Sequence, residues 1–113
     1  MEGFVDGRLN LMGIDVALID EFGCKIDGFG DPSSLLFPLF PPRDGPGFPF
    51  LTSIDPYEDT LFNGSQMERF LAEWAYVVAQ AQSEAEKQIV EAVRQMASRC
   101  EREVHTYLKF IGD

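Results

Sequence analysis

Carboxylates that gather at three places along the chain are its first candidates for chemistry. Calcium and magnesium bind several convergent oxygen atoms, which such clusters can supply. None of the three has the ligand spacing of an EF-hand loop, and short acidic clusters are more often turns. We therefore interpret them as solvated turns and predict no metal site and no cofactor. The clusters are Asp15 with Asp20 and Glu21, Asp27 with Asp31, and Asp55 with Glu58 and Asp59.

A second candidate is the pair formed by Glu101 and His105, the only histidine of the chain. One helical turn separates the two, which is a workable spacing for acid/base chemistry. A histidine in the last turn of a helix also interacts favourably with the helix dipole, and no serine or cysteine nucleophile stands beside this one. The chain has no Walker loop, GxSxG elbow or HExxH motif. We therefore predict a protein that is not an enzyme and has no catalytic residues.

The two cysteines, Cys24 and Cys100, are far apart in the sequence, and neither belongs to a CxxC motif. This spacing argues against a disulfide framework and against a zinc site. We predict that both are small buried side chains.

The 113 residues divide into two halves of different composition. Residues 1–62 hold eleven acidic and three basic side chains, a net of −8 out of the total −10, whereas residues 63–113 are nearly balanced. All seven prolines and nine of the ten glycines lie in residues 1–64. The length fits a single domain over residues 1–113, in which a strand- and loop-rich acidic half packs on a helical half that ends in a strand.

The acidic half begins with a strand-like pattern over residues 4–26. Ile14, Val16 and Leu18 place three apolar side chains on one face of a strand. Residues 20–23 then read as a turn before a second short strand. We therefore expect a β-hairpin as the opening element.

Residues 28–50 contain six prolines, which exclude a regular helix because each removes an amide donor and restricts the residue before it. We predict a long loop here, followed by an edge strand at residues 50–54. The loop has too many leucine and phenylalanine side chains for a solvated linker. Two interpretations stay open: the phenylalanines cover the helices, or they are held for a partner together with nearby acids. The second predicts a partner-binding surface of Asp31, Phe37, Phe40, Asp44, Phe48, Asp55, Tyr57, Glu58 and Asp59.

The helical half contains two serines that are each followed three residues later by glutamate, the spacing of a capping box. Apolar residues recur at steps of three and four after each serine, which predicts helices near residues 65–80 and 84–104. Because the apolar phase continues across the junction, one continuous helix is the alternative. The two spacings are Ser65 with Glu68 and Ser83 with Glu86.

Residues 107–111 read as a terminal strand. Together with the hairpin and the strand at residues 50–54, it completes a small antiparallel sheet. We expect this sheet to pack against a helical hairpin or one long helix, with the long Pro/Phe-rich loop as part of the acidic half. The predicted fold class is therefore α+β.

Two segments carry a resemblance: DPYEDTLFN at residues 55–63 and YLKFIGD at residues 107–113. They resemble a D-x-Y-x-D-T-x-F-N segment before a helix and a Y-L-x-F-I-G-D ending in a group of small, mostly uncharacterised bacterial proteins. The resemblance covers about half of the chain, from Asp55 onward; Glu58 stands where glycine is expected, and residues 38–49 are outside it. The group implies no established activity. Small acidic bacterial proteins of this kind are similar, by analogy, to immunity proteins, which bind and neutralise a cognate toxin.

The net charge of −10 disfavours binding to nucleic acid or anionic lipid and favours a basic protein partner. No basic and apolar leader follows Met1, and no apolar run approaches the ~18 residues of a membrane span, so we expect a cytoplasmic protein without membrane association. The leading expectation is an immunity protein that occludes a basic toxin. The alternatives are an acidic nucleic-acid mimic that inhibits a DNA-binding enzyme, and a self-assembling scaffold or homodimer.

Overall fold

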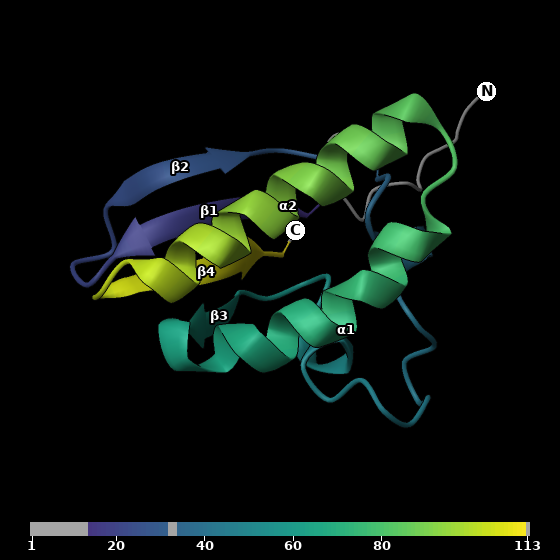
Figure 1. Ribbon diagram of the computed structural model, residues 1–113, viewed down its shortest axis with the longest axis horizontal. Helices are drawn as coiled ribbons and strands as arrows, with labels where there is room; N and C mark the ends of the chain where they lie inside the picture. Colours follow the sequence, from purple (N-terminus) through teal and green to yellow (C-terminus); the bar gives the residue numbers. More distant parts are fainter. Residues whose placement is uncertain (1–13, 32–33, 113) are drawn as a thin grey trace.

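The computed structural model describes residues 14–31 and 34–112 and confirms the α+β fold, with a four-stranded antiparallel sheet. The strands lie in the order β2-β1-β4-β3, so β2 and β3 are the edges. Both helices lie on the same face of the sheet (Figure 1). In chain order the elements are β1 (Asp15–Asp20), β2 (Lys25–Phe29), β3 (Thr60–Asn63), α1 (Met67–Gln80), α2 (Glu84–Arg102) and β4 (Thr106–Ile111).

The predicted β-hairpin is confirmed, and Asp20 builds its turn. The Asp20 carboxylate accepts hydrogen bonds from the amides of Phe22 and Cys24, each at 2.9 Å. Gly23 completes the turn with a φ of 83°, a conformation that costs a residue with a Cβ atom free energy. The part of the predicted strand pattern that precedes residue 14 lies outside the described residues.

The predicted edge strand at residues 50–54 is wrong, because Leu51–Ser53 form a short 3-10 helix. The hydroxyl groups of Thr52 and Ser53 donate to the carbonyls of Phe48 and Phe50, so local bonds replace a strand ladder. The edge strand is β3 instead, and it pairs with β4. Pairing between segments so distant in the sequence leaves little local signal, which explains the error.

Two separate helices are confirmed, and the chain between them is extended at Ala81. The predicted cap of α2 is present: the Ser83 hydroxyl accepts the Glu86 amide (3.1 Å), and the Glu86 carboxylate accepts the Ser83 amide (3.0 Å). This reciprocal cap fixes where α2 begins.

The predicted cap of α1, Ser65 with Glu68, is wrong. Asn63 and Gln66 make the reciprocal pair: Asn63 Oδ1 accepts the Gln66 amide (3.1 Å), and Gln66 Oε1 accepts the Asn63 amide (2.8 Å). The Ser65 hydroxyl donates to the same Asn63 oxygen at 2.7 Å. The cap therefore sits at the end of β3 and starts a 3-10 turn (Gly64–Gln66) that leads directly into α1.

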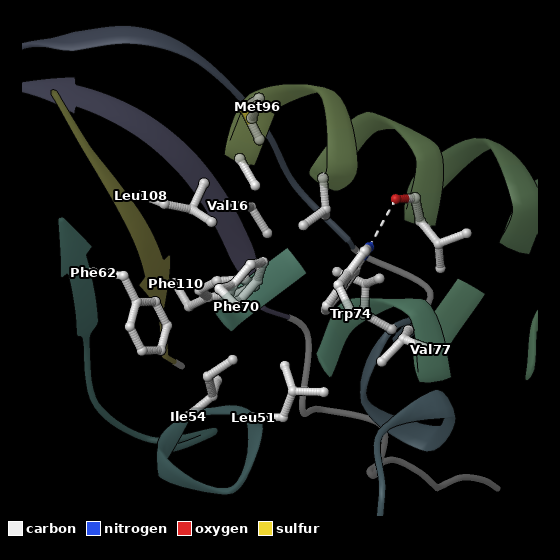
Figure 2. Close-up of a cluster of buried hydrophobic side chains, with 14 of the residues drawn as sticks. Val16, Leu51, Ile54, Phe62, Phe70, Trp74, Val77, Met96, Leu108 and Phe110 are labelled. Atoms are coloured by element: carbon white, nitrogen blue, oxygen red, sulfur yellow. Dashed lines mark hydrogen bonds between the residues drawn. The ribbon is translucent and has the colours of Figure 1, made fainter. Parts of the chain in front are cut away.

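The core lies between the helices and the face of the sheet that they cover (Figure 2). Side chains alternate along β4, where Leu108 and Phe110 are fully buried. On α1, Phe70 stacks on Trp74 with ring centroids 5.5 Å apart, and both rings contact Phe110. The Trp74 indole N–H donates to the Val90 carbonyl at 3.0 Å, which joins α1 to α2 through a satisfied buried polar group.

Candidate functional site

Asp31 is not part of an exposed surface, contrary to the prediction that it contacts a partner. The residue is 1% exposed, and its carboxylate accepts hydrogen bonds from the amides of Leu35 (2.9 Å) and Leu36 (2.8 Å). A carboxylate paired with backbone amides in the interior stabilises the loop that supplies them. The sequence could not reveal this role, because the pattern around a loop aspartate does not show whether its side chain is buried or exposed.

The predicted contact residues Phe37, Phe40 and Phe48 are half-buried and pack against the core. Phe40 meets Trp74 edge to face with ring centroids 5.7 Å apart, and Phe48 contacts Tyr76 at 4.9 Å. Of the two interpretations of the loop, the one in which its phenylalanines cover the helices is therefore the one that the packing favours.

The end of the Pro/Phe-rich loop is anchored by Glu73, a buried carboxylate on α1. Glu73 Oε1 accepts hydrogen bonds from the amides of Leu51 (3.0 Å) and Phe50 (3.1 Å). The Arg43 guanidinium donates to the Ile54 carbonyl at 3.0 Å, and the next residue, Asp44, is exposed. Asp44 is thus presented on a loop that is tied to the residue immediately before Asp55.

Residues 55–59, called the acidic turn from here on, form the part of the predicted surface with the most exposed side chains. Asp55 Oδ1 accepts the Tyr57 amide at 2.8 Å, and the Glu58 amide donates to the Asp55 carbonyl at 3.4 Å. The Asp55 amide donates in turn to the Thr60 hydroxyl at 3.3 Å. These bonds fix the backbone, so the turn presents its side chains from a defined conformation.

The acidic turn rests on the end of β4. A Cβ atom at Gly112 would collide with the backbone of Tyr57 and Glu58, so only glycine allows this close approach. The Lys109 ammonium lies 3.4 Å from Asp59 Oδ2 and adds an ion pair between turn and strand. The contacts hold the turn against the sheet rather than in open solvent.

The same contacts unite the two segments that carry the resemblance. In the pairing of β3 with β4, Thr60 lies opposite Phe110 and Asn63 lies opposite Tyr107. Residues 55–63 and 107–112 therefore form one continuous structural unit, although more than forty residues separate them in the sequence.

Large apolar side chains remain exposed on this unit. Tyr57 is 66% exposed and Leu61 on β3 is 51% exposed, while Glu58 and Asp59 are exposed beside Tyr57. An aromatic side chain with acids around it has the composition of a protein-binding hot spot. Leu61 was not predicted as a site residue, and only the pairing of β3 with β4 reveals that it faces away from the core.

Sequence reasoning also missed two apolar side chains at the opposite end of the sheet, Phe22 (82% exposed) and Val104 (80% exposed). Phe22 lies in the β1–β2 turn and Val104 lies between α2 and β4, and the pairing of Asp20 with Thr106 brings these turns side by side (Figure 1). The sequence did contain a signal for the exposure of Phe22. A phenylalanine within a predicted tight turn cannot reach the core.

The candidate acid/base pair is not assembled. Glu101 and His105 are both exposed and line a cleft of about 400 Å³, but no hydrogen bond joins them within the part of the chain that the structure describes. His105 lies beyond the end of α2 with a φ of 59°, so the prediction that it occupies the last helical turn is wrong. The helix ends earlier than predicted because the backbone at Glu103 is already extended, with a φ of −102° and a ψ of 127°.

The two cysteines differ. Cys100 is buried as predicted, and its burial raises the pKa of the thiol, whose sulfur donates to the Thr106 carbonyl at 3.4 Å. Cys24 is exposed, so its predicted burial is wrong. It lies in the hairpin turn immediately before β2, where its amide donates to the Asp20 carboxylate.

Among the described residues, no three His, Cys, Asp or Glu side chains converge in a way that could hold a metal ion. None of the helices in the described ranges is long and apolar enough to span a membrane. Comparison with protein-family models, with curated proteins and with solved structures returned no match.

Proposed function

We propose that this protein binds a basic partner protein through the acidic turn, and that it acts as an immunity protein that occludes a toxin. One observation carries the proposal: Tyr57 is displayed on a hydrogen-bonded turn, with Glu58 and Asp59 exposed beside it. We also propose that the protein acts in the cytoplasm and that it is not an enzyme.

The energetics of such a contact favour Tyr57 as its anchor. Tyrosine is enriched in hot spots because its large ring buries apolar area while its hydroxyl keeps a hydrogen-bonding partner. A turn that is already ordered loses little conformational entropy on binding. Leu61 extends the apolar contact, and Asp44 and Asp55 add to the acidic rim.

The distribution of carboxylates favours a protein partner over the role of a nucleic-acid mimic. A mimic needs acidic side chains spread along one face in place of successive phosphates. Asp31 is buried, and Asp27 lies 3.8 Å from the Arg99 guanidinium on α2, so these two acids do not extend the acidic turn into such a row. A compact acidic patch with one aromatic anchor suits occlusion of a basic surface.

The test begins with co-expression of this chain and the products of its neighbouring genes, followed by purification on a tag carried by this chain. Association with the captured protein is then measured by biolayer interferometry at low and high salt. We expect Glu58→Lys to lower the association rate constant and its salt dependence, because exposed interface charges steer encounter. Tyr57→Ala should raise the dissociation rate constant about 30-fold, which corresponds to about 2 kcal/mol for a hot spot.

Glu21→Lys is the matched control, because it makes the same change of charge on an exposed residue at the other end of the sheet. It should leave the dissociation rate constant unchanged and alter association less than Glu58→Lys does. Equal rate constants for the wild type, Tyr57→Ala and Glu58→Lys would remove the acidic turn from the interface. Capture of this chain alone would favour the self-assembling scaffold instead.

A further inference from the structure

A groove lined by arginines runs along α2 of this acidic protein. It lies beside the inner face of β2, at the edge of the sheet away from β3. The helix packs against β1 and β4, so the edge strand β2 extends past it (Figure 1). Phe29 on β2 and Ala92 on α2 line both lobes of the groove, one of about 540 Å³ and one of about 350 Å³. The groove is thus continuous along the helix.

The larger lobe is basic. Three arginines of α2 line it, Arg94, Arg99 and Arg102, against one acid, Asp27. Arg94 pairs with Glu91, and Arg99 pairs with Glu103 at 2.8 Å, whereas Arg102 makes no ion pair in the described part of the chain. The pairs that exist are exposed, and exposed ion pairs contribute little net stability, so an incoming carboxylate can replace them. Guanidinium groups favour such partners because they donate two parallel hydrogen bonds.

The smaller lobe is apolar. Ile89 and Leu35 line it together with the shared Phe29 and Ala92. The groove therefore passes from apolar to basic along the direction of α2, which suits a chain segment with an apolar side chain at one end and acids at the other.

The wall opposite α2 is an edge strand. Within residues 14–31 and 34–112, β2 has a sheet neighbour on one side only, β1. The amide of Gly28 donates to Asp27 Oδ1 at 2.7 Å, an exposed bond to a side chain that a new strand can displace. An open sheet edge beside a helix is a geometry in which proteins bind extended peptides by adding a strand.

We propose that this groove binds an extended acidic segment of a partner protein, laid along β2. Its carboxylates pair with Arg94, Arg99 and Arg102, and an apolar side chain rests on Phe29 and Ala92. Nucleic acid and anionic membranes are disfavoured, because three arginines on a protein with a net charge of −10 do not offset the repulsion of a polyanion. For a short peptide only nearby charges matter, since charges are screened beyond about 8 Å at physiological salt. Among the described residues Arg102 is the unpaired cation there, and the peptide reaches Arg94 and Arg99 by displacing their exposed pairs with Glu91 and Glu103.

The probe is a fluorescein-labelled peptide of three glutamates followed by leucine and phenylalanine, and fluorescence anisotropy measures its binding to the full chain. We expect saturable binding that salt weakens. Arg94→Glu and Arg102→Glu should each weaken it about tenfold, because each replaces an attraction to the peptide carboxylates by a repulsion. Arg69→Glu on α1 makes the same exchange away from the groove and should change the affinity little.

A variant that binds the acidic peptide more tightly gives a further test, because a misfolded variant would bind it more weakly. Asp27→Asn removes the carboxylate that competes for Arg99 while keeping an oxygen for the Gly28 amide, so this variant should bind the acidic peptide several-fold more tightly. Strand addition should also slow hydrogen exchange of the Gly28 amide in the complex.

Three results would overturn the proposal. One is the absence of saturable binding to the acidic peptide. Another is equal or tighter binding of a peptide with lysine in place of each glutamate. The third is unchanged exchange at Gly28 in the saturated complex, which would exclude a strand added along β2.

Discussion

The Pro/Phe-rich loop and the acidic turn are neighbours in the sequence and both contain acids and aromatic rings. The loop buries Asp31 and packs its rings on the core, whereas the turn leaves Tyr57 and Glu58 exposed. In the loop, Asp31 is buried against backbone amides, and the amides of Phe50 and Leu51 are bound by Glu73 from α1. In the acidic turn, Glu58 and Tyr57 are exposed. The loop therefore contributes to the stability of the fold, whereas the turn is displayed on it.

The partner of a carboxylate, rather than its place in an acidic cluster, therefore decides its role. A carboxylate that accepts two interior amides cannot be removed without leaving them unsatisfied. A carboxylate in water on a fixed turn makes no such contribution and is free to meet a partner. Four substitutions test this difference, and the first should cost the most stability.

Glu73→Ala should have the largest effect. It leaves the amides of Phe50 and Leu51 without their acceptor in a buried site, and we expect a loss of about 2–4 kcal/mol in the free energy of unfolding. Urea denaturation measures it. Glu73→Gln keeps an oxygen acceptor and should lose less, and a loss below about 0.5 kcal/mol for the alanine variant would show that the loop does not depend on this anchor.

Asp31→Ala should come next, with a loss of about 1–3 kcal/mol, because the amides of Leu35 and Leu36 lose their acceptor. The same denaturation experiment applies. Asp31→Asn, which retains one acceptor oxygen, serves as the matched variant. A stability equal to that of the wild type for the alanine variant would place Asp31 with the exposed acids.

Glu86 stands between the two classes, because it is partly exposed and accepts backbone amides. Hydrogen bonds from the amides of Gln82 and Ser83 lower the pKa of its carboxylate. A pKa that is lower in the folded state stabilises the protein above the ordinary pKa of glutamate, and this contribution is lost as the pH falls through the lowered value. Glu86→Gln should therefore reduce the fall of the melting temperature on acidification, and an unchanged pH profile would contradict the role of this cap.

Glu58→Lys should have the smallest effect on stability, within about 0.5 kcal/mol, because the turn uses the backbone of Glu58 and leaves its side chain exposed. Thermal unfolding of the variant beside the wild type is the measurement. A loss as large as that of Asp31→Ala would mean that the acidic turn is structural like the loop.

Much of the fold could be predicted because its signals are local. The hairpin turn around Asp20, the cap formed by Ser83 and Glu86, and the terminal strand all depend on residues close in the sequence. The position of β3 and the burial of Asp31 depend on distant partners, or on the direction in which a side chain points.

The candidate site was predicted only in part for the same reason. Tyr57, Glu58 and Asp59 are exposed as an acidic surface requires, whereas Phe40 and Phe48 pack on aromatic residues of α1 that composition alone could not pair with them. The groove beside α2 was not predicted at all. In the sequence its arginines have the pattern of the exposed face of an ordinary helix, and only the position of β2 beside α2 makes them line a groove.

Hydrogen exchange of the complex with the captured partner, followed by mass spectrometry, shows whether the acidic turn or the loop contacts the partner. We predict slowed exchange in residues 55–61, with residues 36–53 unchanged, because the turn contacts the partner and the loop is already packed. Protection confined to residues 36–53 would contradict it and return the Pro/Phe-rich loop to the role of the binding surface.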